Sequence, residues 1–394
     1  MSWFNQIISI TIMNLRNIPQ RLAASLVATI GVAAVVGVFA GVLSMASGFE
    51  KTMIAAGADD AAVILRAGST GELSSGIGNE QANIIADAPG IARDDESAIV
   101  SAELYVLVDV AKKSTNEGSN VPLRGVQSRA FETRNDLRII DGRTFEPGKY
   151  ELIAGRGASG QFEGLEVGNV LPFGVLEWTV VGVFEAGGGV AESELWTDVR
   201  VLKEAYRRGG FQSVRARLDG PDGLERLTTA LKDDPRIDVD VYTEKEFYSS
   251  QSENLSTFIR GVGYPLTILM AIGAVFGALN TMYSSISARS KEIGTLRAIG
   301  FGPMPVLMSV IIESAFLAVI GGAIGGGLAF LFLNGFTVST LNGASFSQVV
   351  FDFAVSPDLL LQGLVAAILI GLVGGLFPAI RAVRMPVSMA LREL

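Results

Sequence analysis

Four long stretches of this sequence are almost free of charge, and they constrain the fold more than any other feature. Residues 22–49, 261–288 and 359–380 contain no Asp, Glu, Lys or Arg, and residues 298–351 contain only Glu313. A hydrocarbon core about 30 Å thick is spanned by roughly 20 apolar residues in a helix. The sequence therefore predicts an α-helical membrane protein, with transmembrane helices at residues 22–49, 261–287, 303–333 and 358–380.

The absence of two residue types excludes several kinds of chemistry. The chain has no Cys and no His, so it can form neither a Cys/His zinc site nor a His-based catalytic triad. It also lacks a Walker A loop, because no G-x-x-x-x-G-K-[ST] sequence occurs. We therefore expect no catalytic residue, no metal site and no cofactor in this chain, and any ATPase would be a separate subunit.

The positive charges outside residues 50–260 all fall on one predicted side of the membrane. They lie in the N-terminal segment, between the second and third spans, and near the C-terminus: Arg16, Arg21, Arg289, Lys291, Arg297, Arg381, Arg384 and Arg392. Positive residues mark the cytoplasmic side, so both termini are predicted to be cytoplasmic and residues 50–260 extracytoplasmic. This block carries 23 basic and 35 acidic residues, which argues against a nucleic-acid ligand.

The outer block has the pattern of an α+β domain inserted between the first and second spans. Short apolar runs bounded by turn residues predict strands at 61–65, 98–110, 121–126, 179–184, 214–218 and 237–242. Residues 80–87 and the segment after Pro221 predict helices. We expect two lobes, one at about 57–120 and 213–243 and an inserted β-rich lobe at about 121–212. A stalk helix at 244–260 would continue the second span outward, and the first span would extend through Ala56.

The remaining segments are short. Residues 1–21 combine apolar residues such as Trp3, Phe4 and Ile8 with Arg16 and Arg21, which predicts an interfacial amphipathic helix on the cytoplasmic face, the alternative being a frayed tail. Residues 288–302 are expected as a cytoplasmic helix, 334–357 as an outer loop and 381–394 as a cytoplasmic tail. In residues 289–301 the apolar spacing of Ile293, Leu296 and Ile299 favours a helix with a docking edge over a solvated connector.

Two features lie within the predicted spans. Each span has a G-x-x-x-G pair, namely Gly37/Gly41, Gly273/Gly277, Gly321/Gly325 and Gly371/Gly375. Such pairs let helices approach closely in a bundle or a dimer, although glycine is common in membrane helices and generic packing is the alternative. Glu313 is the only ionisable residue deep in a span. We favour a structural role for it, through hydrogen bonds to a neighbouring helix, over a proton relay, because the spans contain no second titratable group.

Several of these segments resemble one protein family. Glu292-Ile293-Gly294 followed by Ala298-Ile299-Gly300 resembles the E-I-G-x-x-x-A-[I/V]-G motif of the MacB/FtsX-like permeases, which are subunits of bacterial ATP-binding-cassette (ABC) transporters. Further segments resemble the family along essentially the whole chain: Glu313, Leu317, Gly321-Gly322 and Gly325; Pro378-Ala379, Arg381-Ala382, Arg384, Pro386 and Ala390-Leu391-Arg392; and residues 121–126, 141–143 and 179–183 of the outer block.

The resemblance implies a permease that dimerises, most simply as a homodimer, and binds two cytoplasmic ATPase subunits that hold the ATP and Mg²⁺. It would transmit their closure to the outer domain, a process known as mechanotransmission. The residues that it assigns to ATPase coupling are Glu292, Ile293, Gly294, Arg297, Ala298, Ile299 and Gly300. Ile293 and Ile299 are expected to fill an apolar groove of the ATPase, Gly294 to allow close approach, and Glu292 and Arg297 to orient the contact.

Two functions follow from the resemblance. The first is export across the bacterial inner membrane, with a separate ATPase, a periplasmic adaptor and an outer-membrane channel; the outer domain of the exporter branch, with a porter-like lobe and a β-rich lobe, fits the two predicted lobes. The alternative is a non-transporting transmitter that activates an extracytoplasmic enzyme or sensor. A gene for an adaptor beside this one would favour export. A membrane enzyme is disfavoured, because no His-free pair of nucleophile and base stands out in the outer block.

Overall fold

The computed structural model describes residues 3–55, 57–94, 97–134, 136–343 and 345–386. It divides the chain into two compact units, each built from segments that are far apart in the sequence. A helical unit contains Met1–Ser47, Phe258–Phe336 and Phe353–Leu394, and an outer unit contains Gly48–Thr257 and Thr337–Asp352. The predicted end of the first helix at Ala56 and the tail residues Ala390-Leu391-Arg392 lie outside the described residues.

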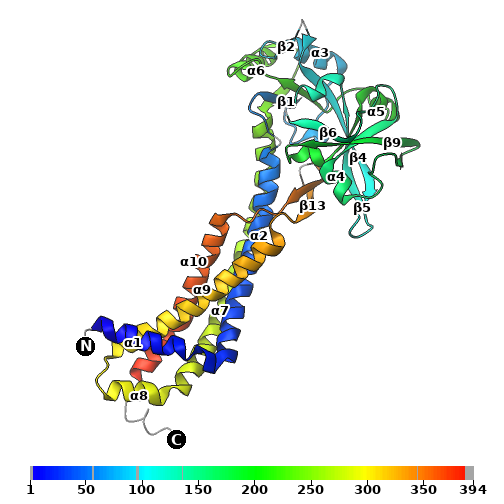
Figure 1. The fold of residues 1–394 in the computed structure, drawn as a ribbon. Coiled ribbons are helices and arrows are strands. Elements are labelled where there is room, and N and C mark those ends of the chain that lie inside the picture. The colour runs from blue at the N-terminus through cyan, green and yellow to red at the C-terminus, as the bar shows by residue number, and fades with distance from the viewer. Residues whose placement is uncertain (1–2, 56, 95–96, 135, 344, 387–394) are drawn as a thin grey trace. The chain divides into compact units, whose positions relative to one another are not determined.

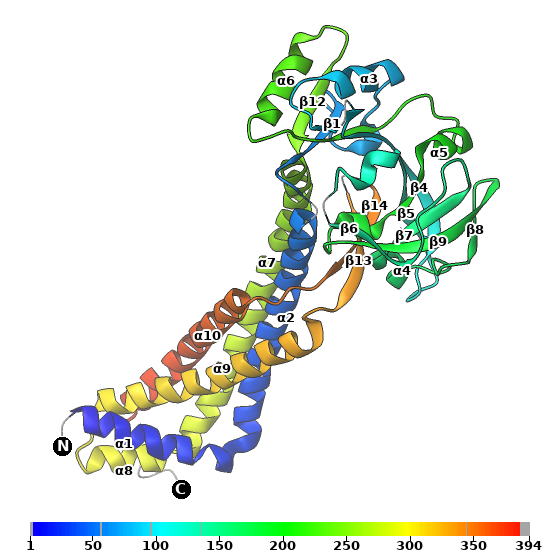
Figure 2. The same ribbon diagram turned by 45° about the horizontal axis from the view of Figure 1, so that its top comes forward.

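The helical unit confirms the prediction of four spans. Within the described ranges, four helices are long and apolar enough to cross a membrane: α2 (Leu22–Ala55), α7 (Glu244–Ala288), α9 (Pro303–Leu333) and α10 (Pro357–Arg384). Two shorter helices, α1 (Trp3–Arg16) and α8 (Ser290–Ala298), lie at one end of this bundle, with the short helix η1 (Ile18–Arg21) leading into α2 (Figures 1 and 2). Local sequence explains several helix starts: α9 and α10 begin on a proline, and the Ser356 hydroxyl caps α10 by accepting from the Leu359 amide.

The outer unit is built on one large sheet, with the strand order β12-β1-β11-β4-β5-β10-β7-β9-β6, and β8 pairs with residues 176–179 of β9 outside this order. Its strands are β1 (Ala61–Arg66), β4 (Val100–Ala111), β5 (Gly118–Val126), β6 (Leu137–Gly142), β7 (Glu151–Gly155), β8 (Val170–Phe173), β9 (Leu176–Ala186), β10 (Leu195–Asp198), β11 (Ser213–Arg217) and β12 (Val239–Thr243); β2 (Arg93–Asp94) and β3 (Ser97–Ala98) pair separately. Its helices are α3 (Asn79–Asp87), α4 (Arg156–Gln161), α5 (Val199–Ala205) and α6 (Gly223–Asp233), with the short turns η2 (Glu72–Ser74), η3 (Ser128–Phe131) and η4 (Val190–Ser193). All the strands and both helices predicted for this block are present.

Strand β4 joins the two expected lobes. Residues 100–103 pair with β11, whereas residues 104–111 pair with β5. The expected boundary between the two lobes, at residues 120 and 121, therefore falls inside β5, which is paired with β4. One hydrophobic cluster also extends from Ile64 and Leu227 to Phe162 and Trp178, so the two lobes share a core as well as a strand.

The connection between α9 and α10, which the sequence suggested was a loop, is a β-hairpin that belongs to the outer unit. Strands β13 (Thr337–Asn342) and β14 (Ser347–Asp352) pair in register from Thr337/Asp352 to Asn342/Ser347. The β-branched and aromatic residues on both sides of Asn342-Gly343 explain the hairpin. Val350 is buried, and its amide donates to the Ser193 hydroxyl at 2.8 Å, so the hairpin is packed against the β-rich part of the outer unit.

Candidate functional site at helix α8

Helix α8 carries the predicted coupling motif, and its end explains the last glycine of that motif. The Phe301 amide donates to the Leu296 carbonyl at 3.0 Å and the Gly300 amide to the Arg297 carbonyl at 3.2 Å, which is the Schellman arrangement of a helix C-terminus. Gly300 has a φ of 100°, a conformation that favours glycine. The motif therefore ends α8 sharply and turns the chain toward α9.

The structure divides the predicted coupling residues into two groups. Glu292, Ala298, Ile299 and Gly300 are exposed, and Ile299 is 68% exposed. Ile293 and Gly294 are buried. Arg297 is half-buried and donates to the carbonyls of Val383 and Met385, at 3.0 and 2.6 Å, so it links α8 to the end of α10.

The burial of Ile293 changes the interpretation of the motif. Its side chain is only 8% exposed and packs in a cluster that draws on α1, α7, α9 and α10: Ile10, Met282, Ile286, Val306, Val310, Ala379 and Ala382. The expectation that Ile293 inserts into a partner is therefore wrong in this structure. The i, i+3, i+6 spacing identified an apolar helix edge, but the near end of that edge is covered by the chain itself, and Ile299 is the apolar side chain left exposed.

Glu313 of α9 lies in a buried polar cluster with two arginines. Its Oε2 accepts from Arg289 Nη2 at 2.8 Å, and its Oε1 lies 3.2 Å from Arg21 Nη2. The Glu313 side chain is 1% exposed, Arg289 6% and Arg21 14%. The spans themselves contain no second titratable group, but two arginines from just outside them, in η1 and at the α7–α8 junction, reach Glu313. The sequence did not predict these partners.

Further polar side chains complete this cluster. Arg289 Nη1 donates to Asn14 Oδ1 of α1 at 2.7 Å, and Asn14 Nδ2 donates to the Ser309 hydroxyl of α9 at 3.2 Å. Ser285 of α7 accepts from Arg289 and also from Arg21. Asn14 and Glu313 are both buried. One set of contacts thus connects α1, η1, α7 and α9 close to α8, and sequence reasoning missed it because its members are far apart along the chain.

The glycine pairs of the spans behave differently from one another. A Cβ added at Gly37 or Gly41 would meet α9, 3.7 Å from the Gly325 carbonyl oxygen and 3.2 Å from Leu333 Cδ1. A Cβ added at Gly273 or Gly277 would meet no described atom within 4 Å. Gly37 and Gly41 therefore pack inside the chain, whereas the Gly273/Gly277 surface of α7 has no neighbour among the described residues.

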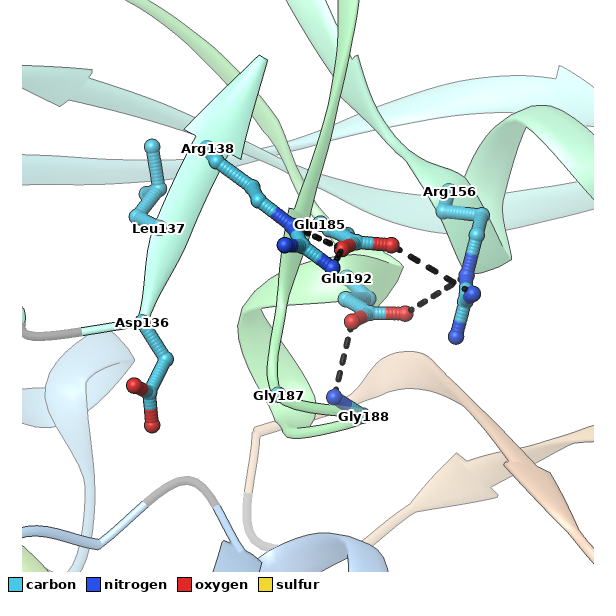
Figure 3. Close-up of a pocket in the computed structure, with 8 residues that line it drawn as sticks. All are labelled: Asp136, Leu137, Arg138, Arg156, Glu185, Gly187, Gly188 and Glu192. Atoms are coloured by element: carbon cyan, nitrogen blue, oxygen red, sulfur yellow. Dashed lines mark hydrogen bonds and ion pairs between the residues drawn. The ribbon is translucent and has the colours of Figure 1, made fainter. Parts of the chain in front are cut away.

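The outer unit has a polar pocket of about 560 Å³ beside the loop that joins β9 to η4. Arg156 lies between two carboxylates, 3.5 Å from Glu185 and 3.3 Å from Glu192, and Arg138 also pairs with Glu185 (Figure 3). Because these charges are paired with one another, the pocket does not present a strong field of one sign. Among the described residues, no group of three or more acidic side chains could hold a metal ion.

Comparison with known proteins places this architecture in a family. The MacB-like periplasmic core domain matches residues 22–234, and the FtsX-like permease C-terminal domain matches residues 266–387. The uncharacterized ABC transporter permease YknZ of Bacillus subtilis is 23% identical over 300 residues, which cover 70% of this chain and 71% of that protein.

Two further relatives carry functional names. The macrolide export ATP-binding/permease protein MacB of Hahella chejuensis is 28% identical over 242 residues, which cover 58% of this chain and only 35% of that protein. The lipoprotein-releasing system transmembrane protein LolC of Neisseria meningitidis is 26% identical over 341 residues, covering 76% of this chain and 79% of that protein. With four spans and both family domains in order, this chain is a multi-pass inner-membrane protein that belongs to the MacB/FtsX-like family of ABC transporter permeases.

Proposed function

We propose that this chain is the permease subunit of an export system, and that it converts closure of separate ATPase subunits into movement of its extracytoplasmic unit. The observation that carries this proposal is the construction of α8. One face is exposed, at Glu292, Ala298, Ile299 and Gly300, and we name it the α8 docking surface. The opposite face is fixed to other helices, through Ile293 in the bundle core and Arg297 on the end of α10.

This arrangement suits a mechanical input. A force applied to the α8 docking surface acts on the helices that α8 contacts, and the Glu313 cluster ties α1, α7 and α9 together immediately beside it. Interactions of this kind hold elements in discrete arrangements, which is what transmission of a movement requires. ATP and Mg²⁺ would be bound by the partner ATPase, and no nucleic acid is involved.

The proposed assembly contains a second copy of the chain. The α7 surface around Gly273 and Gly277 lies among large exposed apolar side chains, including Leu269, Ile272 and Phe276. Small residues at this spacing allow close helix contact in a membrane. We propose that this surface faces the second copy. A periplasmic adaptor and an outer-membrane channel complete the proposal, supported by the resemblance to the exporter branch.

The experiment first identifies the ABC ATPase that co-purifies with the tagged full chain from its native membrane, and then co-expresses the two proteins. Ile299→Asp should reduce the ATPase that co-purifies, because a buried apolar anchor of an interface contributes about 2 kcal/mol or more, roughly a thirtyfold change in affinity. The matched control is Ile140→Asp, an exposed isoleucine (46%) of β6 in the outer unit, which should leave co-purification unchanged. Wild-type binding by the Ile299→Asp variant would exclude the α8 docking surface.

The second candidate function, a transmitter that activates an extracytoplasmic enzyme or sensor, uses the same contacts. The observation that favours it is the pairing of the Glu313 carboxylate with two arginines. Because of this pairing, the carboxylate is not available to bind a polar substrate that crosses the membrane. Mass spectrometry of the intact co-purified complex separates the two functions. An adaptor and an outer-membrane channel in the complex support export, whereas a periplasmic hydrolase or sensor supports the transmitter.

A further inference from the structure

The outer unit contains a buried ion network that neither proposed function requires. It consists of four carboxylates and three guanidinium groups, none with a side chain more than 10% exposed: Glu72, Glu103, Glu194, Glu244, Arg124, Arg134 and Arg215. The members come from both lobes and from the first turn of α7. We call this set the buried ion network.

Arg124 of β5 lies at the centre of one half of the buried ion network, and Arg215 lies at the centre of the other half. Its Nη1 donates to Glu72 of η2 at 2.6 Å and to Glu103 of β4 at 2.9 Å, and its Nε and Nη2 each donate to Glu194 at 2.7 Å. The ring of Tyr105 lies 4.8 Å from this guanidinium. The Tyr105 hydroxyl donates to the Ser347 hydroxyl of β14 at 3.0 Å, so the hairpin is joined to the same group.

Arg215 of β11 connects the network to α7. It pairs with Glu244, the first residue of α7, and its Nη2 donates to the Tyr248 hydroxyl at 2.9 Å. Its Nε lies 3.3 Å from Glu103, which links it to Arg124. Gly57 also lies against the first turn of α7: a Cβ added at Gly57 would lie 2.4 Å from the Lys245 Cα, so that position admits only glycine.

Stability alone does not account for so many buried charges. Replacing a buried ion cluster by apolar residues of similar volume is often neutral or stabilising, because desolvation offsets the attraction between the charges. Two of its carboxylates are nevertheless held in the charged form. Burial by itself would raise the pKa of Glu72 and of Glu103, but the neighbouring arginines hold both below their usual range, whereas burial raises the pKa of Glu244 in spite of Arg215. What such a network does provide is directional contacts that fit one arrangement of the elements carrying them.

We propose that the members of the buried ion network are positioning residues, which fix the first turns of α7, both lobes and the β13–β14 hairpin in one arrangement. Movement of those turns then displaces the whole outer unit as one body. The inference adds the receiving end of transmission to the proposed function and rests on it for its purpose. The rigidity itself can be measured in the chain alone.

The test is spin-label distance spectroscopy on the purified full chain, which has no native Cys. Labels on exposed positions of α7, the β8–β9 turn and α6, introduced as Ser250→Cys paired with Val175→Cys or with Thr229→Cys, report the spread of distances from α7 to each lobe. We expect narrow distributions in the otherwise wild-type chain. Arg215→Met with Glu244→Leu removes one charge of each sign, and we expect the narrow distributions to be lost while the melting temperature is kept.

A matched control removes an exposed ion pair instead. Lys113→Met with Glu166→Leu deletes a 2.8 Å pair with side chains 38% and 55% exposed, and its distributions should stay narrow. If the double variant of the network does not fold, Tyr248→Phe removes only the hydroxyl that accepts from Arg215 and should broaden both distances. Narrow distributions in the network variants, or broad ones in the wild-type background, overturn the inference. Loss of ATPase binding would contradict the proposed function and leave these distances unaffected.

Discussion

Replacement of Glu313 by Gln tests the polar cluster beside α1 and α8. From the sequence alone, Gln should preserve assembly and activity because it keeps a hydrogen-bonding group, and Leu should not. The structure reverses the first expectation. Gln cannot neutralise Arg289 and Arg21, which lie 2.8 and 3.2 Å from the two oxygens of Glu313, and one end of its amide would present N–H groups to a guanidinium.

The magnitude follows from the burial of the three groups. Removing one partner of a buried ion pair costs about 3–5 kcal/mol, since it leaves an uncompensated charge. Arg21 is 14% exposed and Arg289 only 6%, so most of the penalty should come from Arg289. We expect Glu313→Gln to destabilise the chain by about 3 kcal/mol, at the lower end of that range because Arg21 can regain some water.

Thermal unfolding of the detergent-purified chain, followed by size-exclusion chromatography after heating, measures this loss. A second substitution, Arg289→Gln, should recover much of the stability in the Glu313→Gln background, because the unpaired buried charge is then removed. Glu292→Gln is the control: it also removes a carboxylate charge, but on the exposed face of α8, and should change stability by no more than about 0.5 kcal/mol. A Glu313→Gln variant that melts with the wild type would refute the reasoning.

Three further predictions concern topology, acid stability and helix packing. In intact cells an impermeant thiol reagent should label Ser114→Cys but not Lys291→Cys, although both positions are exposed. Labelling of Lys291→Cys would invert the predicted orientation. Arg124 and Arg134 lower the pKa of Glu103, and arginines likewise lower that of Glu72, in spite of burial. Their contribution to stability is therefore full above the unfolded-state value of about 4.5 and lost as pH falls through the lower folded-state values. Burial raises the pKa of Glu244, whose contribution has the opposite sign, so circular dichroism of the Glu244→Gln variant should show the acid-induced decline below about pH 4.5 without that opposing contribution. Gly371→Val should lower the melting temperature of the single chain, since a Cβ there lies 2.5 Å from Ala318 Cβ. Gly273→Val should leave the chain folded and reduce dimer cross-linking. Equal melting temperatures for the two variants would contradict this assignment.

The spans were readable from the sequence because lipid imposes one simple requirement, that backbone polar groups be satisfied within each apolar helix. The strands of the outer unit were readable for a similar local reason, as their β-branched runs end at turn residues. The partners of Glu313 were not readable, because a residue pattern does not show that Arg21 and Arg289 reach into the bundle. Ile293 and Ile299 belong to one apolar edge, and the positions of α1, α7, α9 and α10 decide that Ile293 is covered and Ile299 is not.

The β13–β14 hairpin has a consequence for biosynthesis. The outer unit is completed by residues 337–352, which are translated after α9. The outer unit therefore cannot finish folding until β13 and β14 have been synthesised. Until they arrive, Ser193 and Tyr105 lack the hairpin contacts made by Val350 and Ser347. A fragment excised at residues 48–257 would remain in that unfinished state, with an apolar surface open where β14 normally packs, whereas joining residues 337–352 to its end through a flexible linker would supply the missing strands.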